Sequence, residues 1–154
     1  MRNIIIFFII ITFFRGANAN FAKISSNNFI DLHVYYAVTE ESRKKGLMWK
    51  KQLIRSSGML FLYEKPQIVN IWMHNTFIPL DVIFIDKNKK VSSIKKGKPL
   101  SRKIISSDKK VIAVLELPLN CSKKISLNVG DKLDWIYLEF SKKKTYHCLS
   151  YDKD

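Results

Sequence analysis

Cysteine, glycine and proline are scarce in this chain of 154 residues, which contains two, five and four of them respectively. The two cysteines, Cys121 and Cys148, have one possible disulfide connectivity, but the sequence does not determine whether they come within bonding distance. No Cys-x-x-Cys or other close ligand spacing is present, so no metal site is expected. Neither a Pro/Gly/Ser-rich linker nor an internal repeat divides the chain, which indicates a single domain.

The common catalytic signatures are also missing. The sequence has no Gly-x-Ser-x-Gly, His-Glu-x-x-His or phosphate-loop motif, and no candidate nucleophilic cysteine. We therefore expect no cofactor, and the sequence favours a binding protein over an enzyme of a common class.

Acidic residues are few, because 13 Asp and Glu stand against 27 Lys and Arg and give a formal net charge of +14. The lysines are spread over predicted turns and strand ends, which is typical of a solvated basic surface. Without a focused patch or a recognised motif, no nucleic acid is expected as a partner. An anionic component of the cell envelope is the more specific possibility.

The sequence has one long apolar run at its N-terminus. Arg2 precedes an almost unbroken apolar segment over residues 4–14, and Ala17-Asn18-Ala19 has the small-x-small form of a cleavage site. This pattern predicts a signal peptide over residues 1–19 and an exported protein, periplasmic or secreted. The alternative is an uncleaved anchor, but a spanning helix needs about 20 apolar residues and this run stops at Arg15. No transmembrane span is expected after signal removal.

Alternating apolar and polar residues predict a half-buried strand over residues 29–38, with one face formed by Ile30, Leu32, Val34, Tyr36 and Val38. Thr39 then offers an N-cap, and Glu40 and Glu41 are favourable near the positive end of a helix dipole. A short helix is therefore expected to run to about Leu47.

Further short apolar runs predict strands over residues 58–63, 68–74, 80–86, 91–95, 111–117 and 133–140. Short strands without alternating helices predict a mostly β fold, a compact antiparallel sandwich or barrel-like domain with one short α-helix, over residues 20–140. The run 80–85 is apolar on both faces apart from Asp81, which is typical of a central strand. Residues 141–154 lack periodicity and are expected to form a basic flexible tail.

Three stretches carry a resemblance to a known family: Gly46-Leu47-Met48, then Gly58-Met59-Leu60-Phe61, then residues 71–86 with Trp72-Met73-His74-Asn75-Thr76 and Pro79-Leu80-Asp81. Their order and spacing resemble the bacterial and archaeal family called domain of unknown function 192, from about Val34 to Asp131. The resemblance implies a compact, mostly β sandwich and an often exported protein, but no established activity. The chain departs from the family pattern at His74, where lysine is common, at Lys50, where arginine is common, and at Leu119-Asn120.

Asp81 is the charged residue that interrupts the predicted central strand, so its carboxylate needs hydrogen-bond donors or a cation. Pro79 suits a sharp entry into this strand, and Asn75 and Thr76 favour a turn before it. We expect turn amides or the side chains of Asn75 and Thr76 to satisfy Asp81. A ligand-facing role for this acid is the alternative.

The same corner suggests a binding site. Trp72 and Met73, as neighbours in a predicted strand, should point to opposite faces, so that one borders a surface groove. Apolar walls with a few convergent polar groups are typical of ligand pockets. The candidate ligand-binding residues are Arg43, Met48, Trp72, His74, Asn75, Thr76, Asp81 and Glu116.

Three functions fit these residues. The first is a non-catalytic extracytoplasmic module that binds a small ligand or an anionic envelope component in a groove near residues 72–81. The second is a hydrolase-type enzyme that uses Asp81 or Glu116 with His74 as an acid–base pair, or Thr76 as a nucleophile. The third is an envelope assembly or interaction protein with a basic surface.

Overall fold

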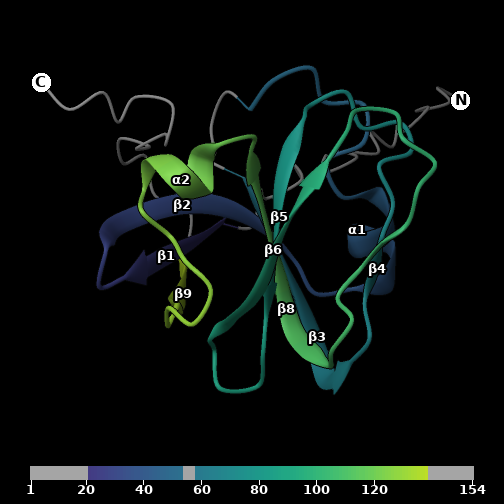
Figure 1. Ribbon diagram of the computed structural model, residues 1–154. Helices are drawn as coiled ribbons and strands as arrows, with labels where there is room; N and C mark the ends of the chain where they lie inside the picture. Colours follow the sequence, from purple (N-terminus) through teal and green to yellow (C-terminus); the bar gives the residue numbers. More distant parts are fainter. Residues whose placement is uncertain (1–20, 54–57, 139–154) are drawn as a thin grey trace, which may run out of the picture.

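The computed structural model describes residues 21–53 and 58–138 (Figure 1). The predicted signal peptide over residues 1–19 and the predicted tail over residues 141–154 lie outside the described residues. The described residues form nine strands and two helices: β1 (Phe21–Ser26), β2 (Phe29–Ala37), α1 (Glu40–Lys45), β3 (Met59–Gln67), β4 (Asn70–Ile71), β5 (Leu80–Ile85), β6 (Val91–Gly97), β7 (Ile105–Ser106), β8 (Val111–Pro118), α2 (Cys121–Lys124) and β9 (Asp134–Leu138).

Seven of the strands form one sheet in the order β6-β5-β8-β3-β2-β1-β9, and β4 pairs with β7 in a separate small sheet. The prediction of a mostly β fold is confirmed, with an open, sandwich-like arrangement in place of a closed barrel. One pair departs from the predicted antiparallel pattern, because β2 and β3 run parallel, with Tyr35 beside Met59. The connection between them contains α1, which gives the chain the length that a parallel crossover needs.

Two apolar clusters lie on opposite sides of the central strands. Alternate residues of β3 and β8 divide between them: Leu60 and Leu115 belong to the first cluster, and Phe61 and Val114 to the second. The sheet curls around the first cluster, since β1, β2, β5 and β8 all contribute to it. Figure 1 shows β1, β2 and β9 on one side of the central strands, and α1 and β4 on the other. All six residues of β5 are buried between these layers, as predicted for a central strand.

The helix α1 begins as predicted. Thr39 is the N-cap, its side chain accepts a hydrogen bond from the Ser42 amide at 3.1 Å, and the Ser42 hydroxyl accepts one from the Thr39 amide at 3.0 Å. The helix ends at Lys45, two residues before the expected end, because Gly46 adopts a left-handed φ of 46°. Glu40 and Glu41 in the first turn and the basic residues of the last turn all favour the helix dipole.

Some predicted strands have the wrong extent, and three observed elements were not predicted. The predicted strand 68–74 is reduced to β4, because the chain turns where the Thr76 amide donates to the Met73 carbonyl at 3.1 Å. The predicted buried face of 29–38 is wrong at Val38, which is 47% exposed because β2 ends at Ala37. The sequence analysis did not recognise β1, β7 or α2.

Candidate functional site

A pocket of about 520 Å³ opens on the side of the sheet that carries the second apolar cluster. Its walls come from α1 and the loop after it, from β3 and β8, and from the chain around β4. Apolar side chains form much of the wall, namely Leu47, Met48, Phe61, Ile71 and Trp72. The polar groups that could hold a ligand are Glu40, Arg43, Lys44, Tyr63, Asn70, Thr76 and Glu116.

The helix α1 places Arg43 in the wall of this pocket. The Arg43 guanidinium donates to the carbonyl of Val38 and, at 2.9 Å, to that of Leu62. It also lies over the ring of Tyr63, 4.9 Å from the centroid. Among the residues that the structure describes, no carboxylate lies within ion-pair distance of Arg43. Main-chain carbonyls and a ring therefore fix this cation, and its charge also acts on Glu40, whose pKa is lowered by the hydrogen bond from Lys44 and also by this cation.

Glu116 contributes a buried carboxyl group from the middle of the sheet. It lies on β8, pairs with Val82 of β5 and Met59 of β3, and is 5% exposed. Over residues 21–53 and 58–138, its carboxyl group has no hydrogen-bond or salt-bridge partner, and Glu116 is one of the residues that line the pocket. Burial raises the pKa of Glu116 to about 8, because desolvation disfavours the charged form. At neutral pH this side chain is mainly a carboxylic acid that can donate a hydrogen bond.

Tyr63 adds a phenolic hydroxyl group to the same pocket. Burial raises the pKa of Tyr63 to about 12, Arg43 opposes this shift, and Glu116 adds to it. Tyr63 therefore keeps its proton over the whole physiological range. Together, Tyr63, Glu116 and Arg43 offer hydrogen-bond donors, which suits a ligand with acceptor oxygen atoms.

Five of the eight predicted site residues line the pocket, namely Arg43, Met48, Trp72, Thr76 and Glu116. His74 and Asn75 lie beside it: the His74 ring stacks on Trp72 with 4.4 Å between centroids, and the Asn75 carbonyl accepts from the Trp49 amide at 2.8 Å. Lys50, another position that departs from the family pattern, lies over the Tyr35 ring at 5.0 Å. Trp72 is 46% exposed and Met73 is buried, as expected for neighbours that point to opposite sides.

Asp81 lies on the opposite face of the sheet from the pocket. It is 2% exposed, and its carboxylate accepts hydrogen bonds from the amide of Ser122 at 3.0 Å and from the hydroxyl of Ser122 at 2.6 Å. The prediction that the turn before β5 satisfies Asp81 is therefore wrong in the partner, which comes from α2. The side-chain hydroxyl of Thr76 instead donates to the His74 carbonyl at 3.3 Å.

The sheet register separates the two acids of the predicted acid–base set. Asp81 is paired with Leu117, and Val82 is paired with Glu116. Directly paired residues share a face and successive residues alternate, so Asp81 and Glu116 point to opposite faces. The two candidate acids of the hydrolase hypothesis therefore do not share one site, so at most one of them could act with His74.

Tyr63 and Phe61 were not identified from the sequence, although a signal for them exists. Residues 58–63 were predicted as a strand, and in a strand residues 61 and 63 share a face. Their assignment to the pocket face, however, depends on the pairing of β3 with β8, a contact between segments about 50 residues apart in the chain.

Cys121, which is buried at the start of α2, takes part in a disulfide. The other cysteine of the sequence, Cys148, lies outside the described residues. Cys121 lies on the side of the sheet that carries Asp81 and Ser122, away from the pocket.

The described residues contain neither a cluster of metal ligands nor a membrane-spanning helix. Within residues 21–53 and 58–138, no three His, Cys, Asp or Glu side chains gather as a metal site. Neither helix in the described part of the chain has the length and apolar character needed to cross a membrane.

Comparison with known proteins gives one family match. The model of the family DUF192, described as uncharacterised, matches residues 22–135. This range includes both helices, the pocket residues and all strands except Phe21 of β1 and residues 136–138 of β9. No curated protein matches the sequence significantly.

Two solved structures share the fold. A candidate transcription regulator from Sinorhizobium meliloti 1021 is 33% identical with a TM-score of 0.69, over 75% of this chain and 92% of that one. A protein of unknown function from Novosphingobium aromaticivorans DSM 12444 is 28% identical with a TM-score of 0.67, over 75% of this chain and 84% of that one.

Proposed function

Because this chain belongs to the DUF192 family, whose members are described as uncharacterised, its role has to be inferred from its own side chains. We propose that the protein is an extracytoplasmic binding module whose pocket holds a small ligand with an apolar body and hydrogen-bond-accepting oxygen atoms. The export signal predicted over residues 1–19 supports the location. The observation that carries the proposed binding is the buried carboxyl group of Glu116 in the same pocket wall as Tyr63 and Arg43.

The pocket has the properties of a small-molecule site. Its volume of about 520 Å³ lies within the usual range for ligand pockets, about 300 to 1,000 Å³. More of its wall area is apolar than polar, and ligand sites typically combine apolar walls with polar groups that orient the ligand. A neutral acid, a phenol and a fixed guanidinium all donate, so acceptor oxygens such as those of carboxylates, phosphates or sugars are the matching ligand groups.

Intrinsic fluorescence tests this proposal, because Trp72 lines the pocket and is one of three tryptophans. In a Trp49→Phe/Trp135→Phe background, the remaining fluorescence reports on the pocket alone. We expect cell-wall fragments, sugars or anionic oligomers to include a compound that quenches Trp72 in a saturable way at pH 7.

Variants of the donor groups assign the binding to the pocket. Tyr63→Phe keeps the ring beneath Arg43 and removes the hydroxyl, so we expect affinity for such a compound to fall about tenfold, the value of one lost hydrogen bond. Tyr36→Phe is the matched control, since Tyr36 packs against the first apolar cluster on the other side of the sheet. Equal affinity of Tyr63→Phe, Glu116→Leu and the control would contradict the proposal.

A further inference from the structure

Three loops meet beside the pocket and carry large apolar side chains at their tips. The amide of Trp49 donates to the Asn75 carbonyl at 2.8 Å, and the amide of Leu100 donates to the Thr76 carbonyl at 3.0 Å. The rings of Trp49 and Phe77 lie edge to face with 6.1 Å between centroids. We call Trp49, Phe77 and Leu100 the loop-tip surface.

These three side chains remain in solvent. Trp49 is 64% exposed, Leu100 is 55% exposed and Phe77 is 38% exposed. Trp49 and Leu100 also adopt left-handed backbone conformations, with φ of 65° and 58°, which are unfavourable for bulky residues. Backbone hydrogen bonds thus hold apolar groups outward at an energetic cost, and a cluster of exposed apolar groups of this kind marks an interaction surface.

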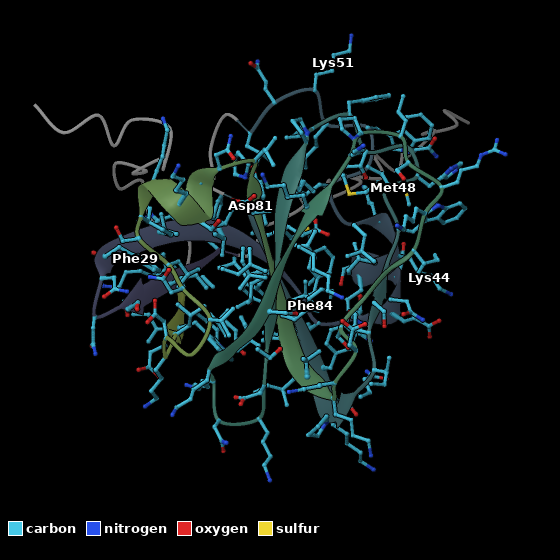
Figure 2. All side chains as sticks on the ribbon, in the orientation of Figure 1. Phe29, Lys44, Met48, Lys51, Asp81 and Phe84 are labelled. Atoms are coloured by element: carbon cyan, nitrogen blue, oxygen red, sulfur yellow. The ribbon has the colours of Figure 1, made fainter. Side chains whose placement is uncertain are left out.

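The charge around the loop-tip surface is of one sign. Residues 43–52 and 96–104, which contain two of the loops, include nine lysines and arginines and no acidic residue. Lys51, Lys98 and Arg102 are exposed, and among the described residues none of them forms a salt bridge. Figure 2 shows the Lys51 side chain directed away from the molecule, on the same side as Met48 of the pocket wall.

From this arrangement we propose that the loop-tip surface docks on an anionic lipid bilayer. Tryptophan is enriched at membrane interfaces, where its ring meets both acyl chains and headgroups, and phenylalanine and leucine enter the acyl boundary. Lysine and arginine close to the bilayer are attracted by anionic headgroups. Separate apolar tips on loops rich in lysine and arginine match a fluid anionic surface, which adapts its shape to each tip. This inference does not depend on the pocket ligand.

Docking in this way brings the pocket close to the bilayer. Trp49 follows Met48 directly, and Met48 and Trp72 both line the pocket. The pocket mouth would therefore face lipid headgroups or molecules held near them.

Vesicle flotation tests the inference. The protein is isolated from expressing cells, and intact mass confirms that wild type and variants have the same N-terminus. Vesicles of phosphatidylglycerol and phosphatidylcholine in equal amounts are compared with vesicles of phosphatidylcholine alone, at about 150 mM salt, where exposed charges are largely screened beyond about 8 Å. We expect binding to the anionic vesicles only, and a fall of about tenfold or more for Trp49→Ser/Phe77→Ser.

Matched controls separate the loop-tip surface from general effects. Val129→Ser/Ile136→Ser removes side chains that are 62% and 55% exposed outside the three loops, and it should bind as the wild type does. Lys51→Gln/Lys98→Gln/Arg102→Gln should weaken binding, whereas Lys87→Gln/Lys109→Gln/Lys110→Gln, which removes as many exposed charges elsewhere, should weaken it less. In a Trp72→Phe/Trp135→Phe background, Trp49 fluorescence should shift to the blue on binding.

Three results would each overturn the inference: no binding to anionic vesicles, equal binding by Trp49→Ser/Phe77→Ser and the wild type, or no blue shift of Trp49. Thermal unfolding of each variant verifies the fold. The substituted loop-tip side chains Trp49 and Phe77 are exposed, whereas Trp135, which the fluorescence background replaces, is partly buried against the first apolar cluster. A partner protein at this surface would give the first of these results.

Discussion

Glu116 is the side chain whose protonation couples most strongly to the fold. In the unfolded chain its carboxyl group titrates near 4.5, and burial raises the pKa to about 8 in the folded protein. Between these two values the unfolded state releases the proton and the folded state keeps it. The unfolded state binds fewer protons there, so the free energy of unfolding decreases as pH rises.

Replacing Glu116 with glutamine should remove this dependence. Glu116→Gln keeps the shape and a donor group but does not titrate, so we expect it to be more stable than the wild type at pH 8, with the difference shrinking toward pH 5. In the wild type, the titration of Glu116 can change the free energy of unfolding by at most about 1.4 kcal/mol per pH unit. Urea unfolding at four values across this window measures it, with the exposed Glu64→Gln as control. Parallel stability curves for Glu116→Gln and wild type would show that Glu116 titrates normally.

Asp81 is also a buried acid, but unlike Glu116 it has hydrogen-bond donors among the described residues. Its carboxylate is nearly inaccessible but accepts two hydrogen bonds from Ser122, which joins β5 to α2. Burying a polar group reduces the stability of the folded protein only slightly when the group has hydrogen-bond partners, and strongly when it has none.

Ser122→Ala should therefore destabilise the protein more than its small size suggests. The variant keeps the amide donor and removes the hydroxyl at 2.6 Å, so we expect a loss of about 1.5 to 3 kcal/mol in the free energy of unfolding, the range for hydrogen bonds to charged groups. Chemical denaturation measures the loss. Ser25→Ala, at a half-buried position of β1, is the control and should change the free energy of unfolding by less than about 1 kcal/mol. Equal effects of the two substitutions would mean that Ser122 does not support Asp81.

At the scale of the elements, the approach of β3 to β8 depends on Gly58. A Cβ atom at this position would lie 1.9 Å from the Glu116 carbonyl oxygen and 2.9 Å from a Leu117 methyl group. The Gly58 carbonyl also accepts the Tyr35 amide at 3.0 Å, which joins β2 to the start of β3. The glycine that opens the Gly58-Met59-Leu60-Phe61 motif is thus required by a contact with backbone, which cannot move as a side chain can.

Gly58→Ala should consequently prevent folding or lower stability severely. Overpacking in a well-packed interior lowers the free energy of unfolding by about 1 to 3 kcal/mol. Because the clash at Gly58 is with the backbone of a central strand, we expect a loss of about 3 kcal/mol or more. Gly97→Ala is the matched control, because its added Cβ would meet the Met73 sulfur at 2.6 Å, and a methionine side chain can adjust. Soluble yield and melting temperature compare the two. A Gly58→Ala protein as stable as Gly97→Ala would contradict the close approach.

Secondary-structure elements with a clear periodicity could be predicted from the sequence, and few of the others could. Six of the predicted strands correspond to β2, β3, β5, β6, β8 and β9, and the N-cap at Thr39 is confirmed, because period-two patterns and capping chemistry are local. The elements β4, β7 and α2 have two to four residues, too few to show a period. The parallel pairing of β2 with β3 is a long-range contact that no local pattern specifies.

The candidate site was predictable in part for the same reason. Arg43, Met48, Trp72, Thr76 and Glu116 were among the candidate residues named from the sequence, and all five line one pocket. Whether Asp81 joins them depends on the register of β5 against β8, and a shift of one residue exchanges the faces. Asp81 could therefore not be assigned to a face from its own strand alone.

At the scale of the whole molecule, the disulfide and the N-terminal sequence both indicate the compartment in which the protein works. Cys121 is in a disulfide, and such bonds persist mainly in oxidising compartments outside the cytoplasm. The excess of basic residues would there meet the anionic surface of the cell envelope. The disulfide and the predicted signal peptide over residues 1–19 both support the proposed export.

We expect the exported protein to begin at Asn20, which the intact mass of protein recovered outside the cytoplasm measures. Signal peptidase sites need small residues at the first and third positions before the cut, here Ala19 and Ala17. Ala19→Lys should therefore leave the chain uncleaved and associated with the membrane fraction, whereas Asn18→Gln, at the tolerant position between them, should be processed as in the wild type. A wild-type product that still begins at Met1 would contradict cleavage, and retention of the wild type in the cytoplasm would contradict export. The extracytoplasmic role of the pocket depends on this result, while ligand binding by Tyr63 and Glu116 can be measured independently of it.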